Sequence, residues 1–255
     1  MDPLLNFENH TVLITGAASG FGRLLAQGLA VRGANLVLGD IDEDGLQATI
    51  NSLKLSHDRV VSARNDVSSE SDCEQLVQLA IEKFSRLDSA VNNAGIAHDP
   101  APIHAITEAV MDKQMDVNVK GVLFGMKYQI LAMLQQGKGN ILNVSSMAGI
   151  GGAPKGGAYA AAKHAVAGIT RTAAVEYGKK NVRVNAICPF YSPTNILNVE
   201  GYKTEQDRAR MAMGSPMKRL GEPQEMVNVM LFLLSPGNSY MNGQTIAVDG
   251  GVSAW

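Results

Sequence analysis

Residues 11–33 read TVLITGAASGFGRLLAQGLAVRG, and this stretch sets the architecture of the chain. Its first five residues are apolar or β-branched, as in a buried strand, and an amphipathic helical pattern begins at Phe21. The glycines between them, Gly16, Gly20 and Gly22, permit a tight turn and a close approach of the backbone to a bound anion. A strand, a glycine-rich turn and a helix in this order are typical of the first unit of a nucleotide-binding α/β domain.

The same alternation of strand and helix patterns continues along the chain. Strands are expected at residues 11–15, 35–39, 59–64, 88–93, 140–145, 182–187 and 244–249. Amphipathic stretches such as residues 74–84 separate them. Parallel strands need crossover connections, and helices must then cover both faces of the sheet. We therefore expect an α/β fold: a single-domain, doubly wound (Rossmann) parallel sheet of seven strands with helices on both faces, over residues 1–255.

Composition narrows the functional classes. The 255 residues carry a formal net charge of −2, so no basic field attracts nucleic acid or anionic lipid. No segment approaches the ~18 apolar residues of a membrane span, and the first residues lack a signal-peptide pattern. Cys73 and Cys188 lie in apolar patterns without metal-ligand spacing, which indicates buried free thiols, and the histidines are scattered. The expected protein is cytoplasmic, with no metal and no nucleic-acid or membrane partner.

An acidic residue, Asp40, ends the second expected strand at the spacing typical of dinucleotide-binding domains. A carboxylate there accepts hydrogen bonds from the ribose hydroxyls of adenosine and repels a 2′-phosphate, which favours NAD over NADP. Neither Ala17 nor Ala18 is basic, and no arginine follows Asp40. The alternative is that Asp40 is a loop acid that caps the helix expected near Asp42.

A tyrosine and a lysine stand four positions apart in GGAYAAAKHAVAG, residues 156–168. This spacing places Tyr159 and Lys163 one turn apart on the same face of a helix, with only small residues between them. On its own, the pair also fits an aromatic side chain packed at an interface beside a solvated lysine.

Together with the glycine loop, this pair makes the chain resemble the short-chain dehydrogenase/reductase family, in its branch of about this length. Five motifs carry the resemblance, in the family's order, between Thr11 and Gly251. They are TGxxxGxG at residues 15–22, NNAG at 92–95, Asn118 within MDVNVKG, the serine pair at 145–146, and YxxxK at 159–163. In such enzymes the catalytic serine lies thirteen positions before the tyrosine, which selects Ser146 rather than Ser145.

The resemblance implies a catalytic tetrad of Asn118, Ser146, Tyr159 and Lys163. Tyr159 would exchange the alcohol proton as general acid or base, and Lys163 with the positively charged nicotinamide would lower its pKa towards the working pH. Lys163 would also bind the nicotinamide ribose, Ser146 would stabilise charge on the substrate oxygen, and Asn118 would hold a water in a proton relay. Taken singly, Ser146 also fits a turn at a strand end and Asn118 a helix cap.

The resemblance also implies which residues hold the cofactor. Asp66 and Val67 match the place of the adenine ring, Asn93 and Gly95 match the turn beside the adenosine ribose, and Thr194 matches the contact to the nicotinamide amide. The residues expected to bind NAD are Gly16, Ser19, Gly20, Phe21, Gly22, Asp40, Ile41, Asp66, Val67, Asn93, Gly95, Tyr159, Lys163, Pro189 and Thr194.

Residues 189–221 mix turn formers with a polar helical piece and interrupt the regular pattern. A long irregular insert of this kind is typical of a substrate loop or lid, and a plain connector is the alternative. Pro189-Phe190 stands where the family usually has Pro-Gly. We expect Phe190, with Tyr191, to narrow the substrate site; the alternative is an aromatic side chain packed outward under the lid.

The expected substrate pocket is apolar. It consists of Ser146, Met147, Ala153, Phe190 and Tyr191, with Ile150, Leu197, Met211 and Met213 as further candidates. Met211 and Met213 fit an ordinary core position equally well. No arginine or lysine is clearly aimed at the place of a substrate carboxylate or phosphate, which favours an uncharged substrate.

We therefore expect an NAD-dependent oxidoreductase that interconverts a hydrophobic secondary alcohol and its ketone. One alternative is a 3-oxoacyl thioester reductase acting on an acyl carrier protein, for which Lys120, Lys127 and Lys155 are candidate contacts at the site mouth. Sugar oxidation is another. A non-catalytic nucleotide-sensing protein is the alternative from a different class, because fold does not dictate function.

The surface pattern indicates self-association. Two expected long helices, residues 108–136 and 158–179, carry more small and apolar residues than one sheet face needs. By the family resemblance, such helices pair into dimers and then tetramers, and the closing VDGGVSAW resembles a second interface. Trp255 would be an unusual exposed residue in a monomer. A homotetramer is therefore expected.

Overall fold

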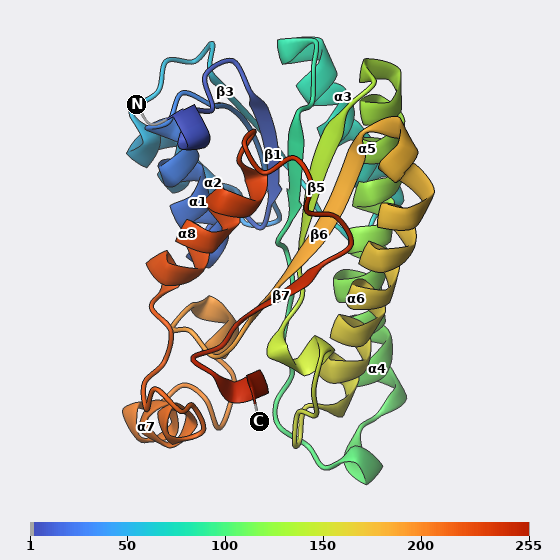
Figure 1. Cartoon of the computed structure of the whole chain (residues 1–255). Helices are drawn as coiled ribbons and strands as arrows, with labels where there is room; N and C mark the ends of the chain where they lie inside the picture. The colour runs from blue at the N-terminus through green and yellow to red at the C-terminus, as the bar shows by residue number, and fades with distance from the viewer. Residues whose placement is uncertain (1–2, 255) are drawn as a thin grey trace.

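Seven parallel strands form one sheet in the computed structural model, which describes residues 3–254 (Figure 1). The strands are β1 Thr11–Thr15, β2 Asn35–Asp40, β3 Val60–Arg64, β4 Ser89–Asn92, β5 Gly139–Val144, β6 Val182–Pro189 and β7 Thr245–Val248. Their order in the sheet is β3-β2-β1-β4-β5-β6-β7. Strands β1 to β3 are added toward one edge of the sheet and β4 to β7 toward the other, so the switch point lies between β1 and β4. Ligands of doubly wound sheets bind at the carboxyl ends of the strands at such a switch point. The expected fold class is confirmed.

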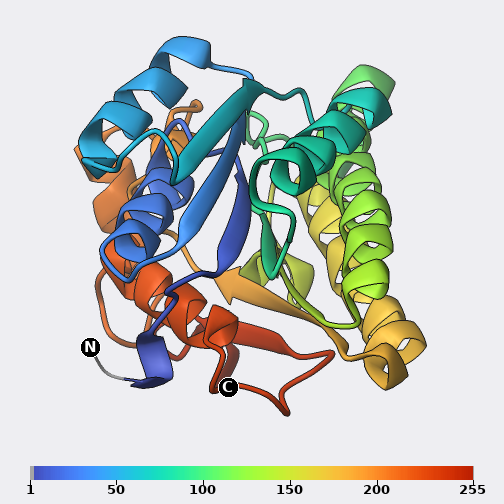
Figure 2. The ribbon, with the colours of Figure 1, turned by 90° about the horizontal axis from the view of Figure 1, so that it is seen from above.

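Helices cover both faces of the sheet, as Figures 1 and 2 show. One layer contains α1 Gly20–Ala30, α2 Glu43–Leu53 and α8 Pro223–Leu234. The other contains α3 Glu70–Phe84, α4 Glu108–Met115, α5 Gly121–Gln136 and α6 Gly157–Tyr177. The remaining helix, α7 Glu205–Met213, lies apart from both layers, in the long segment between β6 and α8.

The alternation of side chains along each strand fills two separate cores. Leu36 and Leu38 of β2 pack with the α1 layer, whereas Val37 packs with the α3 layer. This strand is therefore apolar on both faces, as parallel strands covered by helices require. This explains why the strand segments were recognisable as continuous apolar runs.

The helix expected over residues 108–136 is interrupted, and that prediction is wrong in its middle part. A π-helical turn, Asp116–Lys120, separates α4 from α5. Part of the cause is tertiary, because Asn118 in this turn is bonded to the loop after β4.

Other expectations have mixed outcomes. Cys73 and Cys188 are buried free thiols, as predicted. Within residues 3–254, no helix has the length and apolar character needed to cross a membrane. Trp255 lies outside the described residues.

Candidate active site

The nucleotide loop joins β1 to α1 and needs glycine at fixed places. Gly16 and Gly20 have φ angles of +66° and +52°, which side chains rarely adopt. A Cβ atom at Gly16 would lie 2.8 Å from the side-chain nitrogen of Asn93, and one at Gly22 would lie 2.1 Å from the Gly16 carbonyl oxygen. Ser19 is the N-cap of α1, and its side chain makes no capping hydrogen bond. The loop thus brings bare backbone to the start of α1, where N–H groups can bind phosphate.

The turn after β4 holds this loop in shape. The Asn93 side chain donates to the carbonyl oxygens of Thr15 at 2.9 Å and Gly16 at 3.0 Å. The Thr15 hydroxyl in turn accepts the backbone N–H groups of Asn93 and Ala94, both at 3.1 Å. Asn93, expected beside the adenosine ribose, therefore also stabilises the conformation of the nucleotide loop.

Asp40 lies at the end of β2, next to the nucleotide loop. One of its carboxylate oxygens accepts the Ala18 N–H at 2.8 Å, and the other accepts the Asp42 N–H at 3.0 Å. α2 is capped by Asp42, whose side chain accepts the Gly45 N–H at 3.0 Å, so the capping alternative for Asp40 is wrong. The two bonds orient the Asp40 carboxylate and leave lone pairs for ribose hydroxyls.

The residues expected near adenine follow β3. Asp66 accepts the backbone N–H of Ser68 at 3.0 Å and its hydroxyl at 2.6 Å, which keeps the pKa of the Asp66 carboxyl below its usual value. Val67 is buried against Gly121, where a Cβ atom would lie 2.8 Å from a Val67 methyl carbon. These contacts fix the floor of the expected adenine site.

Three further expected cofactor residues differ in their surroundings. Ile41 is 56% exposed beside Asp40, whereas Phe21 packs against the core under α1. Thr194, from the segment after β6, lies against the nucleotide loop, since a Cβ atom at Gly20 would be 3.4 Å from the Thr194 Cβ. The segment after β6 therefore closes one side of the nucleotide site.

Of the two serines after β5, one faces the tyrosine. Ser146 caps the 3-10 turn Met147–Gly149, and it lies close enough to Tyr159 to lower the pKa of that tyrosine. Ser145 is 2% exposed and donates its hydroxyl to the carbonyl oxygen of Lys163 at 2.9 Å. The structure thus distinguishes a serine available to a substrate from one that anchors α6.

The pKa of Tyr159 differs from the expectation. Burial raises it to about 12, and the nearby Ser146 side chain offsets only part of this rise. The Lys163 ammonium lies 5.6 Å from the centroid of the Tyr159 ring. Among the protein's own groups, desolvation of the phenolate outweighs the nearby positive charge, so the prediction of a lowered pKa is wrong for these groups alone.

Lys163 is itself buried in α6, with 3% of its surface exposed. Its ammonium donates to the carbonyl oxygen of Val144 at 2.8 Å, and burial lowers its pKa to about 8. A Cβ atom at Gly95 would lie 3.5 Å from this ammonium and 2.8 Å from the side-chain oxygen of Asn118. Glycine at position 95 keeps the space next to the lysine open.

Asn118 is fully buried in the π-helical turn. Its side chain accepts the Ile96 N–H at 3.0 Å and donates to the Ile96 carbonyl at 2.9 Å and to Gln114 at 2.7 Å. π-turns of this kind are frequent at functional sites. Asn118 therefore joins the turn to the loop after β4, beside the lysine.

Phe190 and Tyr191 lie at the start of the substrate loop. Pro189 is buried at the end of β6, opposite Val248 of β7. The Phe190 ring lines a hollow of about 130 Å³ under the loop, and a Cβ atom at Gly214 would lie 3.7 Å from its Cζ. This placement agrees with the alternative of an aromatic side chain packed under the lid.

Tyr191 lies between two aromatic neighbours at the start of this loop. Its ring packs edge-on against Phe190 at 4.8 Å and tilted against Tyr202 at 5.6 Å between centroids. Burial raises the pKa of Tyr191 far above its usual value, with contributions from Tyr202 and Tyr159. Its hydroxyl is therefore a neutral donor close to the site.

The remaining candidates for the substrate pocket differ in how far their side chains are exposed. Leu197 and Met211 are buried, at 5% and 8% exposure. Met213 is 61% exposed, so its expected place in the pocket or core is wrong. Met147 and Ala153 lie half-buried after β5, before α6.

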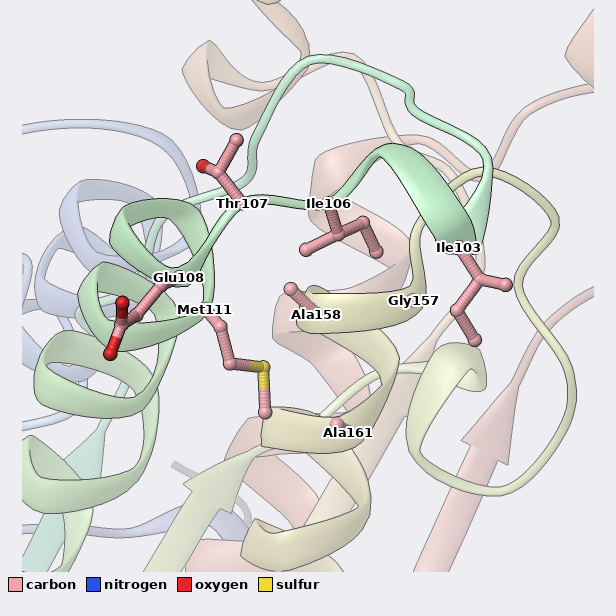
Figure 3. Close-up of a pocket in the computed structure, with 8 residues that line it drawn as sticks. All are labelled: Ile103, Ile106, Thr107, Glu108, Met111, Gly157, Ala158 and Ala161. Atoms are coloured by element: carbon pink, nitrogen blue, oxygen red, sulfur yellow. The ribbon is translucent and has the colours of Figure 1, made fainter.

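A second hollow, of about 360 Å³, is lined by residues of the α4 and α6 region (Figure 3). It opens between the turn Ile103–Ala105, the start of α4 and the first turns of α6. Figure 3 shows that most of its labelled side chains are apolar.

Sequence reasoning missed three neighbours of the site. His98, in the loop after β4, accepts the Tyr159 N–H through its Nε2 atom at 3.4 Å. Tyr202 packs against Tyr191, and Cys188 of β6 is close enough to influence Lys163. Single residues distant in sequence give no periodic or spacing signal, so only the fold reveals them.

Known relatives resemble this chain over nearly its full length. The family model described as "Enoyl-(Acyl carrier protein) reductase" matches residues 16–253. Levodione reductase of Leifsonia aquatica is 39% identical over 99% of this chain and 97% of its own. 2,5-Dichloro-2,5-cyclohexadiene-1,4-diol dehydrogenase of Sphingobium indicum is 37% identical over 98% and 99%. Cis-4-hydroxycyclohexanecarboxylate dehydrogenase of Sinomonas cyclohexanicum is 38% identical over 97% and 98%.

Solved structures agree with these relatives. The crystal structure of levodione reductase has a TM-score of 0.93 at 38% identity, covering 98% of this chain and 99% of that one. A 3-ketoacyl-(acyl-carrier-protein) reductase of Brucella melitensis, solved with NADH, scores 0.89 at 32% identity over 96% and 99%. ElxO, solved with NADP, scores 0.90 at 29% identity over 96% and 99%. The protein is thus an oxidoreductase with a nicotinamide cofactor, and it belongs to the short-chain dehydrogenase/reductase family.

Proposed function

We propose that this protein interconverts a cyclic, hydrophobic secondary alcohol and its ketone with NAD, using Tyr159 as general acid and base. The observation that carries the proposal is the grouping of Ser146, close enough to Tyr159 to lower its pKa, and Tyr159 itself beside the buried Lys163 ammonium. A protein that only senses a nucleotide would not need these three groups together.

The chain's residues fit a nicotinamide cofactor. Cβ atoms at Gly16, Gly22 or Gly95 would collide with neighbouring atoms, so these positions keep backbone and space available along one continuous edge of the sheet. When bound, the cofactor supplies the hydride donor or acceptor. The protein's part is to hold the substrate and to move the proton.

Tyr159 moves that proton. In ketone reduction its neutral hydroxyl, which burial favours, donates a proton to the substrate oxygen. In alcohol oxidation the phenolate accepts the proton, and positive charge at Lys163 and at the nicotinamide favours this form. Ser146 donates a hydrogen bond to the substrate oxygen and stabilises the charge that develops there. Asn118, beside Gly95 and Lys163, continues the proton path towards solvent.

Asp40 supports NAD as the cofactor. Its carboxylate is oriented by the Ala18 and Asp42 amides, and its charge repels a 2′-phosphate. Arg23 follows the loop, but its guanidinium already donates to Thr49 and to the Ala18 and Gly45 carbonyls. Relatives solved with NADH and with NADP both exist, so this preference rests on Asp40.

A six-membered ring is the proposed substrate framework. The names of the three relatives given above all describe action on such rings or imply a dione or diol. The rings of Tyr191 and Tyr202, which pack against each other, offer flat apolar surface to a ring. The Tyr191 hydroxyl, close to Tyr159, can donate to a second oxygen on the same ring.

A thioester of an acyl carrier protein is the second candidate substrate. The similarity to the Brucella melitensis reductase favours it. The basic residues that would meet an acidic carrier are partly engaged, since Lys120 pairs with Asp116 at 2.7 Å and Lys127 with Glu70 at 2.6 Å. These ion pairs make the carrier protein the weaker candidate.

The proposal also includes a homotetrameric assembly and a cytoplasmic location. The outer face of α5 and α6 exposes Leu123, Leu131 and Val175, and the 360 Å³ hollow adjoins α6. An apolar face of this kind supports the proposed homotetramer. The two buried free thiols fit a reducing, cytoplasmic location.

The test is turnover of a substrate panel with NAD and then NADP. The panel contains cyclohexanol, cyclohexane-1,4-diol, an aliphatic secondary alcohol, a 3-hydroxyacyl thioester and a sugar. We expect NAD-linked oxidation of the ring alcohols to be fastest. Turnover of the thioester alone would replace the ring substrate with the second candidate, and NADH binding without any turnover would favour a nucleotide sensor.

A further inference from the structure

Helix α6 carries Tyr159 in its first turn but has no side-chain cap of its own. Its N-cap is Gly156, which makes no side-chain hydrogen bond. The first N–H groups of a helix have no partner within the helix. One of them, the N–H of Tyr159, donates to the Nε2 atom of His98 at 3.4 Å. His98 therefore serves as the cap that Gly156 cannot provide.

The neighbouring residue fixes the imidazole in the form that can accept. The Nδ1 atom of His98 lies 2.8 Å from the carbonyl oxygen of Asp99. A carbonyl oxygen only accepts, so Nδ1 carries the proton and Nε2 is the acceptor in the neutral ring. The cap is thus aimed at the backbone of the catalytic tyrosine.

The same segment also contacts the substrate loop. The Asp99 side chain accepts the Glu200 N–H at 3.1 Å. The Pro100 ring packs beside Gly201, where a Cβ atom would lie 3.4 Å from the Pro100 Cγ. We name residues 98–101 the bridge segment, because it lies between the start of α6 and the substrate loop.

The bridge segment is anchored at its far end as well. The Ala101 N–H donates to the carbonyl oxygen of Lys155 at 2.9 Å, and Ala101 pairs with Gly156 in a short parallel bridge. A short, bonded path therefore joins the loop near Glu200 to the first turn of α6.

We propose that His98 is a positioning residue for Tyr159, and that the Asp99–Glu200 hydrogen bond couples this position to the substrate loop. When the loop settles over a substrate, the bridge segment holds the first turn of α6 and with it the tyrosine hydroxyl. This inference rests on the proposed role of Tyr159 and adds to it the residues that align it.

Matched variants test the positioning role. His98→Leu removes the acceptor, whereas His98→Gln retains an oxygen near the position of Nε2. We expect His98→Leu to lower kcat about three- to tenfold without changing the KM for the cofactor, and His98→Gln to recover most of the rate. Equal loss in both variants, or no loss in either, would overturn the assignment.

A second pair of variants tests the coupling. Asp99→Ala loses the bond to Glu200, and Asp99→Asn retains an acceptor oxygen. We expect Asp99→Ala to raise the substrate KM and lower kcat about threefold, with Asp99→Asn close to the original protein. The double variant His98→Leu/Asp99→Ala should lose less than the product of the single effects. Strictly multiplicative losses would show that the two residues act separately.

Hydrogen exchange gives a readout that needs no turnover. We expect faster exchange in the peptide covering residues 156–160 of His98→Leu, and unchanged exchange in His98→Gln. Unchanged exchange in His98→Leu would overturn the cap even in an active enzyme. If the original protein turned over no substrate, the proposed function would be wrong, but the exchange comparison would still show whether His98 caps α6.

Discussion

The Lys163 ammonium group is buried away from water, and the free energy of unfolding is therefore expected to depend on pH. Burial lowers its pKa from 10.5 to about 8. Below about pH 8 the lysine is charged in both the folded and the unfolded state, and the folded state bears the full cost of burying that charge. Between about pH 8 and 10.5 the unfolded state binds more protons, so the free energy of unfolding rises with pH.

Lys163→Met is therefore expected to stabilise the protein while removing its activity. The gain is up to about 3 kcal/mol near neutral pH, reduced by the lost bond to Val144, and it shrinks as pH rises towards the ordinary lysine pKa. Denaturant unfolding at several pH values measures this. Lys163→Arg, which stays charged, is the control. A gain that is the same at every pH would contradict the burial argument.

Asp40 is expected to set the choice between NAD and NADP. Asp40→Ser removes the charge, so the ratio of kcat/KM for NAD over NADP should fall about 10- to 100-fold. Asp42→Ser is a matched control, because Asp42 is a nearby carboxylate that caps α2 instead. Initial rates with both cofactors give the ratios. Equal shifts in the two variants would show that general charge, rather than ribose binding, decides the preference.

At the scale of elements, strands and the glycine loop were predictable because their signals are local. The apolar runs and the glycines at positions 16, 20 and 22 match requirements of the local backbone, and these involve only residues that are adjacent in the sequence. The π-turn Asp116–Lys120 could not be predicted, since Asn118 bonds to Ile96, which is 22 positions away. The raised pKa of Tyr159 could not be predicted either, because it depends on burial by several elements. The hydrogen bond from the Tyr159 N–H to His98 joins residues that are far apart in the sequence, so it gives no local signal.

The nucleotide loop allows a comparison of two glycines with positive φ. Gly16 and Gly137 have φ angles of +66° and +80°, but only Gly16 has atoms close to where a Cβ would lie. We expect Gly16→Ala to weaken NADH binding at least 100-fold, whereas Gly137→Ala costs about 1 kcal/mol of stability without changing affinity. Calorimetric titration with NADH checks both. Similar affinities in the two variants would mean that the loop does not bind the cofactor.

For the whole molecule, the outer surface of α5 and α6 carries exposed apolar side chains. Leu131 on α5 is 50% exposed and Val175 on α6 is 84% exposed, on adjacent helices at one side of the sheet (Figure 1). Exposed apolar side chains on neighbouring helices favour burial against a second copy. The sequence indicated this face through its small residues, whereas the hollow beside Ile103 became evident only from the fold.

Charges on this face are expected to reduce the assembly. Leu131→Glu combined with Val175→Glu should convert the proposed tetramer into dimers, because carboxylates would be buried without partners. Val31→Glu is the control, since Val31 is 70% exposed at the end of α1 on the other layer. Light scattering after size exclusion gives the masses. An unchanged mass for the double variant would place the interface elsewhere.

In the proposed mechanism Tyr159 transfers the proton, while other residues bind the cofactor. The test compares NAD-linked oxidation of a ring alcohol by the original protein and Tyr159→Phe, together with the NADH affinity of both. We expect kcat to fall by about 10²- to 10⁴-fold and NADH affinity to stay within about twofold. A variant that keeps its NADH affinity and more than about a tenth of the original turnover would rule out Tyr159 as the proton donor and acceptor, because another group would then be moving the proton.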